Sequence, residues 1–395
     1  MLGEMKCGTT SLYSFLLNHP QVIAPATKEP RFLQQNIFKH TTLSRYSMAF
    51  DSISSQENDS VTFDASPTHF RSDVALSWIS QWLPEAKLIV LLRDPIQRSF
   101  SHWKMGSDWL HSSAEKDIAL STALERFAPY LTFKSLVWRG LAHIYWKRCS
   151  RLLGTKQDPP TGLSPLQFNL QELYPAWNPP VGALYHKLSP PAFNSSFGGC
   201  LLRQDEELFL DFVDEIEGRS PEILSDSTLQ WKAILKASEF MLDSKGFLLK
   251  SAVYATQLEK WFQVFPRSQV HIIHTDDLST DPIRVVNGTF DFLGLPRVRV
   301  NSSHRICVKG LQGVMPQMDA KKMGKRIGPS NDGGAAFGSC YDENNGSIPI
   351  GMIRDKAGVL QHYVDPVVAR RLRHYFSSPV KRLYRLLGRD LGWGI

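Results

Sequence analysis

The chain has 395 residues, 42% of them hydrophobic and 21% charged, which is a globular composition with room for one large α/β domain or two smaller ones. The net charge of +7 favours anionic partners, among them nucleotide phosphates, acidic polysaccharide, nucleic acid and membrane surfaces, without choosing among them. Five cysteines in so long a chain exclude a small disulfide-stabilised scaffold, and because no pair of them has zinc-ligand spacing we predict no metal site.

Possible signals for cellular location are of two kinds. Five asparagines stand in glycosylation sequons, more than chance would give, which points to the lumen of the secretory pathway: Asn58, Asn194, Asn287, Asn301 and Asn345. The alternative is coincidence in serine-rich loops. The sequence has no signal peptide and no run of 18 apolar residues that would span a membrane. Either Met1 is an internal methionine of a longer product whose membrane anchor is missing here, or the start is genuine and the protein is cytoplasmic.

Segments with strand and helix patterns alternate along the chain. Strands are predicted at 2–5, 61–65, 87–92 and 270–274, and helices at 10–17, 72–83, from Pro95 onward, and at 229–242, 247–265, 281–294, 365–376 and 380–387. The apolar run at 87–92 is typical of a strand buried on both faces of a parallel sheet. The alternation predicts an α/β fold, a parallel sheet flanked by helices, over a single domain of residues 1–395. Within it, about 107–245 reads as a large insertion, with a Pro- and Gly-rich loop at 154–191, and about 301–358 as a loop-rich lid over donor or acceptor.

A glycine-rich turn lies between the first strand and the first helix, in the segment Gly3-Glu-Met-Lys6-Cys-Gly8-Thr9-Thr10-Ser11. Backbone N–H groups at a helix N-terminus bind anionic oxygens, and glycines let the backbone approach them closely. Gly3 and Gly8 have the spacing of the nucleotide-hydrolase loop, so we expect a P-loop NTPase-like fold. The usual lysine after the second glycine is replaced by Thr9, and a lysine stands inside the loop at Lys6 instead.

This altered loop resembles that of the sulfotransferases that use 3'-phosphoadenylyl sulfate (PAPS). The resemblance continues through Leu12-Tyr13, His19-Pro20 and Lys28-Glu29-Pro30, reappears at 245–296 and 365–393, and covers about half of the chain. The segment Lys28-Glu29-Pro30 is similar to the carbohydrate branch, such as the heparan sulfate N- and O-sulfotransferases. The resemblance implies a PAPS co-substrate, a carbohydrate acceptor and a location in the Golgi lumen or membrane.

A second anchor follows the buried strand at 87–92, where ligands bind in open α/β sheets. The segment reads Arg93-Asp94-Pro95-Ile-Gln-Arg98-Ser-Phe-Ser101-His102. In the family, residues at the positions of Arg93 and Ser101 bind the donor's 3'-phosphate, which suits a guanidinium and a hydroxyl. The alternative is an Arg-Asp turn that only caps a helix.

The resemblance implies in-line, metal-independent transfer of the sulfuryl group. Glu29 is the expected general base, and Lys6 is expected to stabilise the leaving group. N–H groups from Cys7 to Ser11 are expected to bind the donor together with Lys6. The expected donor-binding residues of the loop are therefore Lys6, Cys7, Gly8, Thr9, Thr10 and Ser11. The alternative for Glu29 is a surface carboxylate paired with Lys28 or Arg31. His69 and His102 are rival bases, and Cys7 is expected to be a small loop residue and not a nucleophile.

Some features depart from the family pattern. Arg31 replaces a common histidine, which puts acceptor recognition in doubt. Two segments compete for the family's late donor-covering loop, 321–326 and 354–358. Cys307 and Cys340 flank this region and either form a disulfide, if the protein is lumenal, or remain free thiols.

Other readings stay open. Basic residues cluster near the end of the chain: Arg370, Arg371, Arg373, Lys381, Arg382, Arg385 and Arg389. This cluster either guides an acidic glycan or is a solvated helix face. It lacks the aromatic residues of a site for single-stranded nucleic acid. A P-loop kinase or NTPase would need a lysine after Gly8 and a metal-binding aspartate. A small-molecule alcohol or phenol acceptor, or a non-catalytic nucleotide-binding relative, are the remaining alternatives. We expect no nucleic-acid partner.

Overall fold

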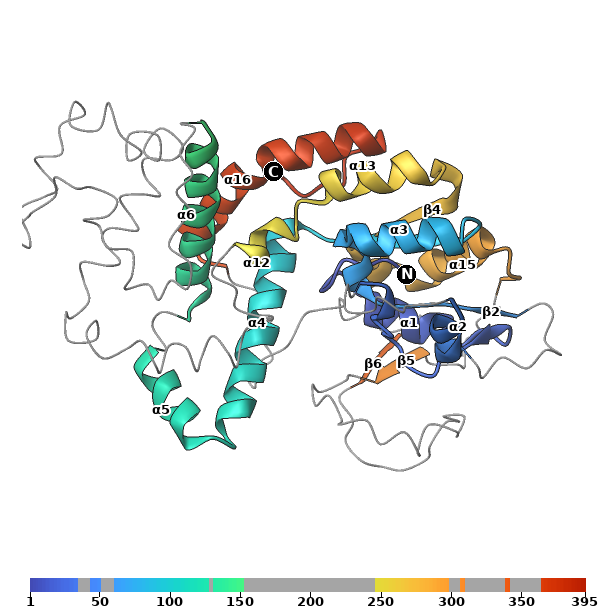
Figure 1. Cartoon of the computed structure of the whole chain (residues 1–395), viewed down its shortest axis with the longest axis horizontal. Helices are drawn as coiled ribbons and strands as arrows, with labels where there is room; N and C mark the ends of the chain where they lie inside the picture. The colour runs from blue at the N-terminus through green and yellow to red at the C-terminus, as the bar shows by residue number, and fades with distance from the viewer. Residues whose placement is uncertain are drawn as a thin grey trace, which may run out of the picture. The chain divides into compact units, whose positions relative to one another are not determined.

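The computed structural model describes residues 1–34, 43–50, 60–127, 131–152, 246–297, 306–309, 338–341 and 364–395 (Figure 1). The chain divides into two compact units. The first comprises Met1–Arg98, Val253–Tyr363 and Ser377–Ile395, and the second comprises Ser99–Ala252 and Val364–Phe376. The predicted helix at 229–242 and the predicted loop at 154–191 lie outside the described residues.

The first unit is built around parallel strands. Strand β3, Leu88–Leu92, pairs in parallel with β4, Val270–His274, and all five residues of β3 are buried. Gly3 forms a parallel bridge to Val90 on β3, so the first predicted strand is present as a short stretch at the start of the chain. Burial along the whole of β3 means that both faces of the strand are covered, as its continuous apolar sequence predicts.

Two further strand pairs are short. Strand β1, Val22–Ile23, pairs in parallel with β2, Val61–Thr62, which is shorter than the predicted strand at 61–65. Strand β5, Ile306–Lys309, pairs antiparallel with β6, Gly338–Tyr341, inside the region predicted as loop-rich. The parallel pairs confirm an α/β architecture for the described part of the first unit.

The helices of the first unit are α1 Thr9–Leu16, α2 Leu43–Ser47, α3 Asp73–Trp82, α13 Tyr254–Val264, α14 Thr275–Thr280 and α15 Pro282–Leu293. In the described part of this unit, 3₁₀ turns lie at Phe32–Gln34, Met48–Phe50, Pro67–Arg71 and Arg267–Gln269. Helix α13 runs beside α3 (Figure 1), where Lys260 pairs with Asp73 and the indole N–H of Trp261 donates to the Phe70 carbonyl. Helix α1 packs beside α15, and α15 packs on β4.

The second unit contains α5 Ile118–Phe127, α6 Phe133–Leu152 and α12 Phe247–Lys250, and the unit boundary falls within α4 Pro95–Ala114 and α16 Pro366–Leu387. Among the residues that the structure describes, no helix is both long and apolar enough to cross a membrane.

Capping residues define the ends of two of the described helices. The Ser72 side chain accepts from Ala75 N–H at the start of α3, and Asp281 accepts from Arg284 N–H at the start of α15. Gly294 ends α15 in the left-handed conformation, with φ 80°. These bonds satisfy amide groups that a helix terminus otherwise leaves unpaired.

Some predicted boundaries are wrong. The single helix predicted at 247–265 is interrupted between α12 and α13, and the two predicted terminal helices form one helix, α16, that contains Pro379. Helix α14 was not predicted, because the sequence TDDLST has no apolar periodicity.

Candidate functional site

The phosphate-binding loop predicted from the sequence leaves the sheet beside β3. The Leu2 amide donates to Ile89 O at 2.8 Å and the Glu4 amide to Leu91 O at 3.1 Å, so the chain runs along β3 before it turns. A Cβ atom on Gly3 would lie 2.1 Å from the carbonyl oxygen of Pro67, which explains why glycine stands there. Lys6, with φ 71°, and Gly8, with φ 86°, then bend the chain through left-handed conformations.

Helix α1 starts directly after this bend. Gly8 is its N-cap and supplies no side-chain acceptor, and the first intrahelical bond runs from Leu12 N–H to Gly8 O. The amides of Thr9, Thr10 and Ser11 therefore form the open N-terminus of the helix, where its dipole favours an anion. This is the arrangement predicted for binding the donor.

Arginines hold the first half of the loop. Arg93 Nη1 donates to Lys6 O at 3.3 Å, and Arg98 Nε donates to Met5 O at 3.1 Å. Glu4 is fully buried, and its carboxylate pairs with Arg71 at 2.9 Å and lies 3.6 Å from Arg98. A buried carboxylate needs such partners, so this cluster fixes the loop to the surrounding structure. Glu4, Arg71 and Arg98 were not predicted as site residues.

The second half of the loop is held by β4 and α13. The Thr275 hydroxyl lies 2.9 Å from both Cys7 O and Leu92 O, and so joins the loop to the carboxyl end of β3. The Tyr254 hydroxyl donates to Arg93 O at 2.9 Å and lies 3.8 Å from Cys7 Sγ. Burial raises the pKa of the Cys7 thiol to about 12, so the thiol stays protonated, in agreement with its predicted role as a small loop residue.

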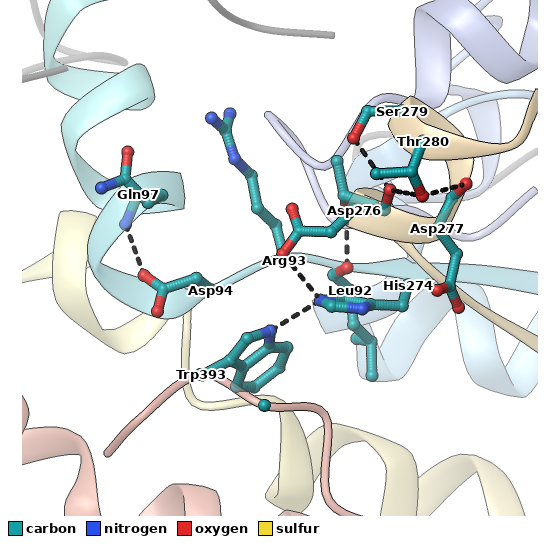
Figure 2. A network of polar contacts seen from close by, with 12 residues as sticks. Leu92, Arg93, Asp94, Gln97, His274, Asp276, Asp277, Ser279, Thr280 and Trp393 are labelled. Atoms are coloured by element: carbon teal, nitrogen blue, oxygen red, sulfur yellow. Dashed lines mark hydrogen bonds and ion pairs between the residues drawn. The ribbon is translucent and has the colours of Figure 1, made fainter. Parts of the chain in front are cut away.

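Asp94 and Arg93 have different roles at the end of β3. Asp94 Oδ1 accepts from the Gln97 amide at 2.8 Å and so caps α4 (Figure 2), while the Arg93 guanidinium reaches the loop. Burial raises the pKa of Asp94, although amide hydrogen bonds oppose that rise. The helix-capping alternative therefore describes Asp94 and not Arg93.

Glu29 lies within a chain of polar contacts that reaches α1. Lys28 Nζ donates to Glu29 Oε1 at 2.8 Å and to Thr10 Oγ1 at 3.0 Å, and Arg31 Nη2 donates to Glu29 Oε2 at 2.7 Å. Partial burial would raise the pKa of Glu29, but Lys28 and Arg31 outweigh it and hold the pKa below the usual value. The pairing with both cations, proposed from the sequence as an alternative, is present, although Glu29 is 20% exposed and not a free surface carboxylate.

The two rival histidines are buried. His69 is 1% exposed and lies 3.8 Å from Asp64, and burial lowers its pKa although Asp64 opposes that. His102, in α4, is also fully buried, with its ring 5.9 Å from that of Phe247. Neither side chain is open to an acceptor, so Glu29 remains the accessible candidate base among these three.

The remaining predicted residues lie elsewhere in the chain. Ser101 lies in α4 and belongs to the second unit, so its role at the 3'-phosphate stays a prediction. The competing late loops at 321–326 and 354–358 lie outside the described residues. In the basic cluster, Arg371 is buried and Arg382 pairs with Glu259, so the cluster is not a uniform solvated face.

Within the described ranges, no group of three or more His, Cys, Asp or Glu side chains is arranged to hold a metal ion. Of the five sequons, Asn287 lies inside α15, where its side chain is half-buried and Thr289 of the sequon is fully buried. The other four lie in parts of the chain that the structure does not describe.

Known proteins resemble this chain in the region of the site. Residues 1–148 match the family "Sulfotransferase domain". The membrane-associated sulfotransferase kil1 of Dictyostelium discoideum is 26% identical over 75% of this chain and 56% of its own length. The bifunctional heparan sulfate N-deacetylase/N-sulfotransferase 3 of Homo sapiens is 29% identical over 26% of this chain and 12% of its own.

A third relative, heparan sulfate glucosamine 3-O-sulfotransferase 5 of Mus musculus, is 24% identical over 38% of this chain and 36% of its own length. The chain thus spans only part of each of these proteins. The motifs from Gly3 to Ser11, at Lys28-Glu29-Pro30 and from Arg93 to His102 all fall inside the matched residues 1–148. The chain is therefore similar to sulfotransferases, among them enzymes of the carbohydrate branch, as its motifs predict.

Proposed function

We propose that this protein transfers a sulfuryl group from PAPS to a hydroxyl or amine of a carbohydrate. The observation that carries the proposal is the loop from Gly3 to Ser11. Its lysine stands at Lys6, and Arg93 binds its backbone at the carboxyl end of β3. A loop fixed in this way presents amide groups and cations to an anion without needing to rearrange.

The donor is expected to bind with its 5'-phosphosulfate on the loop. Amide groups from Gly8 to Ser11 would bind its oxygens, whereas the Cys7 amide donates to Glu4 O at 3.1 Å within the loop. Lys6 would stabilise the negative charge that develops on the leaving phosphate. Arg93 and Ser101 would bind the 3'-phosphate, as the family resemblance implies. Since cations of the protein supply the positive charge, the mechanism needs no metal.

The chemical step is an in-line displacement at sulfur. The acceptor oxygen or nitrogen forms a bond to sulfur while the bond from sulfur to the bridging phosphate oxygen breaks, and adenosine 3',5'-bisphosphate leaves with that electron pair. Glu29 takes the acceptor's proton as general base. Its ion pairs keep it ionised at neutral pH, which this role requires, and Lys28 connects it to Thr10 on the donor-binding helix.

The acceptor and location rest on the relatives. Two relatives are named for heparan sulfate and one as membrane-associated, which supports a carbohydrate acceptor and a protein of the Golgi lumen or membrane. On this proposal the protein is a single sulfotransferase domain with an insertion at about 107–245 and a lid at about 301–358. It is a glycoprotein that carries a disulfide bond.

The activity is tested by following release of adenosine 3',5'-bisphosphate from PAPS with desulfated heparan-type polysaccharide, and separately with simple alcohols and phenols. Glu29→Gln should lose turnover by about 100-fold or more and still bind the bisphosphate. Glu85→Gln, at an exposed carboxylate between α3 and β3, is the matched control and should retain turnover. Turnover with the phenols alone would replace the carbohydrate acceptor by a small molecule. Bisphosphate binding without turnover on any acceptor would indicate a non-catalytic relative.

A further inference from the structure

The segment that follows α16 returns to the carboxyl end of the sheet. Trp393 is buried there, and its indole N–H donates to His274 Nε2 at 2.8 Å (Figure 2). Its ring lies 6.0 Å from that of Tyr254 in an edge-to-face arrangement and 5.8 Å from that of Tyr384. The Trp393 amide also donates to the Tyr384 hydroxyl at 3.2 Å, so both backbone and side chain are fixed.

Two of the residues that Trp393 contacts, His274 and Tyr254, lead to the phosphate loop by separate routes. His274 is the last residue of β4, and the next residue, Thr275, bonds Cys7 O and Leu92 O. Tyr254 starts α13 and bonds Arg93 O, with its hydroxyl beside Cys7 Sγ. Trp393 therefore supports both of the residues that hold the second half of the loop.

Two groups meet Nε2 of His274. The Trp393 indole donates to it at 2.8 Å, and the Asp276 carboxylate lies 3.3 Å from the same nitrogen. Without Trp393, this buried ring would lose its donor and be free to turn toward Asp276. A change at the first residues of α14 would move Thr275 directly, since it adjoins His274.

We propose that Trp393 is a positioning residue for donor binding, acting through His274–Thr275 and through Tyr254 to hold the loop at Cys7 and Arg93. The consequence for donor affinity rests on the proposed function, whereas the consequence for the loop itself does not. Trp393 acts only through these neighbours and does not itself contact the donor. Its loss should destabilise the conformation of the loop more than it destabilises the first unit as a whole.

The test uses Trp393→Phe, which keeps a ring and removes the N–H, and two variants of its acceptor. His274→Gln keeps an acceptor oxygen, and His274→Leu removes it. Trp261→Phe is the matched control, because Trp261 is also buried and its N–H donates to Phe70 O, away from Cys7 and Arg93. Hydrogen exchange of the peptide from Cys7 to Leu12 is measured without ligand, and bisphosphate affinity is measured by calorimetry.

In Trp393→Phe and His274→Leu we expect faster exchange of this peptide and about tenfold weaker bisphosphate binding than in wild type. His274→Gln should restore both towards wild-type values. Trp261→Phe should change neither. If Trp393→Phe does not fold, the two His274 variants decide alone. Unchanged exchange in the loop would overturn the inference, even if wild-type protein binds the bisphosphate well. Failure of wild-type protein to bind it would instead refute the proposed function, while the exchange result would still decide the role of Trp393.

Discussion

Lys6 and Arg31 are the two non-glycine residues with positive φ among the residues that the structure describes, at 71° and 53°. Such conformations cost about 1–3 kcal/mol and persist where the surrounding structure imposes them, often at functional sites. Here one is the loop lysine and the other binds the candidate base. The sequence could identify both positions by motif, but it could not indicate that their backbones are left-handed.

Replacing Lys6 by glycine separates its backbone from its amine. Glycine adopts φ 71° without strain, so Lys6→Gly should melt no lower than wild type while donor binding falls at least about tenfold. Lys6→Ala should lose both stability and binding. Thermal melting and calorimetry on the two variants check this. Normal donor affinity in Lys6→Gly would show that the amine has no role.

The ion pair between Arg31 and Glu29 should control how activity depends on pH. Glu29 has a lowered pKa, so its ionised form, and the activity that needs it, persists until pH falls below the ordinary range of a glutamate. Arg31→Ala removes one of the groups that lower this pKa. The acid limb of the kcat/KM profile should therefore move to higher pH, whereas Arg297→Ala, at an exposed arginine paired with Asp291, should leave it in place. An unmoved acid limb in Arg31→Ala would argue against Glu29 as the base.

The site residues that a local motif carries could be predicted, and those recruited from elsewhere could not. Lys6, Glu29 and Arg93 stand in recognisable segments. From the sequence alone, Glu4 is only a loop residue. Its buried contact with Arg71 depends on the fold, because the two residues are 67 positions apart in the chain. Thr275 and Trp393 were missed for the same reason.

Thr275, the first residue of helix α14, joins the end of strand β3 to the phosphate loop. Thr275→Val keeps the shape and removes the hydroxyl, leaving two buried carbonyls without it, which should cost about 1–3 kcal/mol and weaken donor binding. Thr289→Val is the control, since its hydroxyl bonds Val285 O within α15. Denaturant unfolding and calorimetry compare the two. Equal donor affinity in both variants would contradict the role given to Thr275.

The pairing of β5 with β6 bears on whether Cys307 and Cys340 form a disulfide. Their register sets Cys307 opposite Cys340, and directly opposite residues of an antiparallel pair lie about 4.5–5.5 Å apart at Cα, within the range of a disulfide. We therefore expect these two cysteines to be bonded in protein made in an oxidising compartment. Peptide mapping without reduction measures this directly. Complete alkylation of both thiols in unreduced protein would refute it and weaken the lumenal location.

Elements with strong local signals were predicted well. The apolar run of β3, the strand at 270–274 and the capped helix α15 agree closely with the structure. The break between α12 and α13 and the continuity of α16 through Pro379 depend on packing, which overrides local preference. The register of β5 and β6 could not be predicted, because it joins segments about thirty residues apart.

For the molecule as a whole, composition and alternation indicated the α/β class, and the parallel pairing of β3 with β4 confirms it. The division into two units was not predicted, since it follows from contacts between distant segments. The single-domain organisation and the parts played by the insertion and the lid remain predictions. The net charge of +7 is consistent with an anionic donor and acceptor but selects neither.

A PAPS site is tested by calorimetric binding of adenosine 3',5'-bisphosphate compared with ADP and Mg-ATP, on wild type, Lys6→Ala and Arg93→Ala. We expect wild type to bind the bisphosphate in clear preference to both other nucleotides, and each variant to lose this binding. Equal binding of ADP and the bisphosphate, or preference for Mg-ATP, would contradict a PAPS site and favour a nucleotide-hydrolase relative.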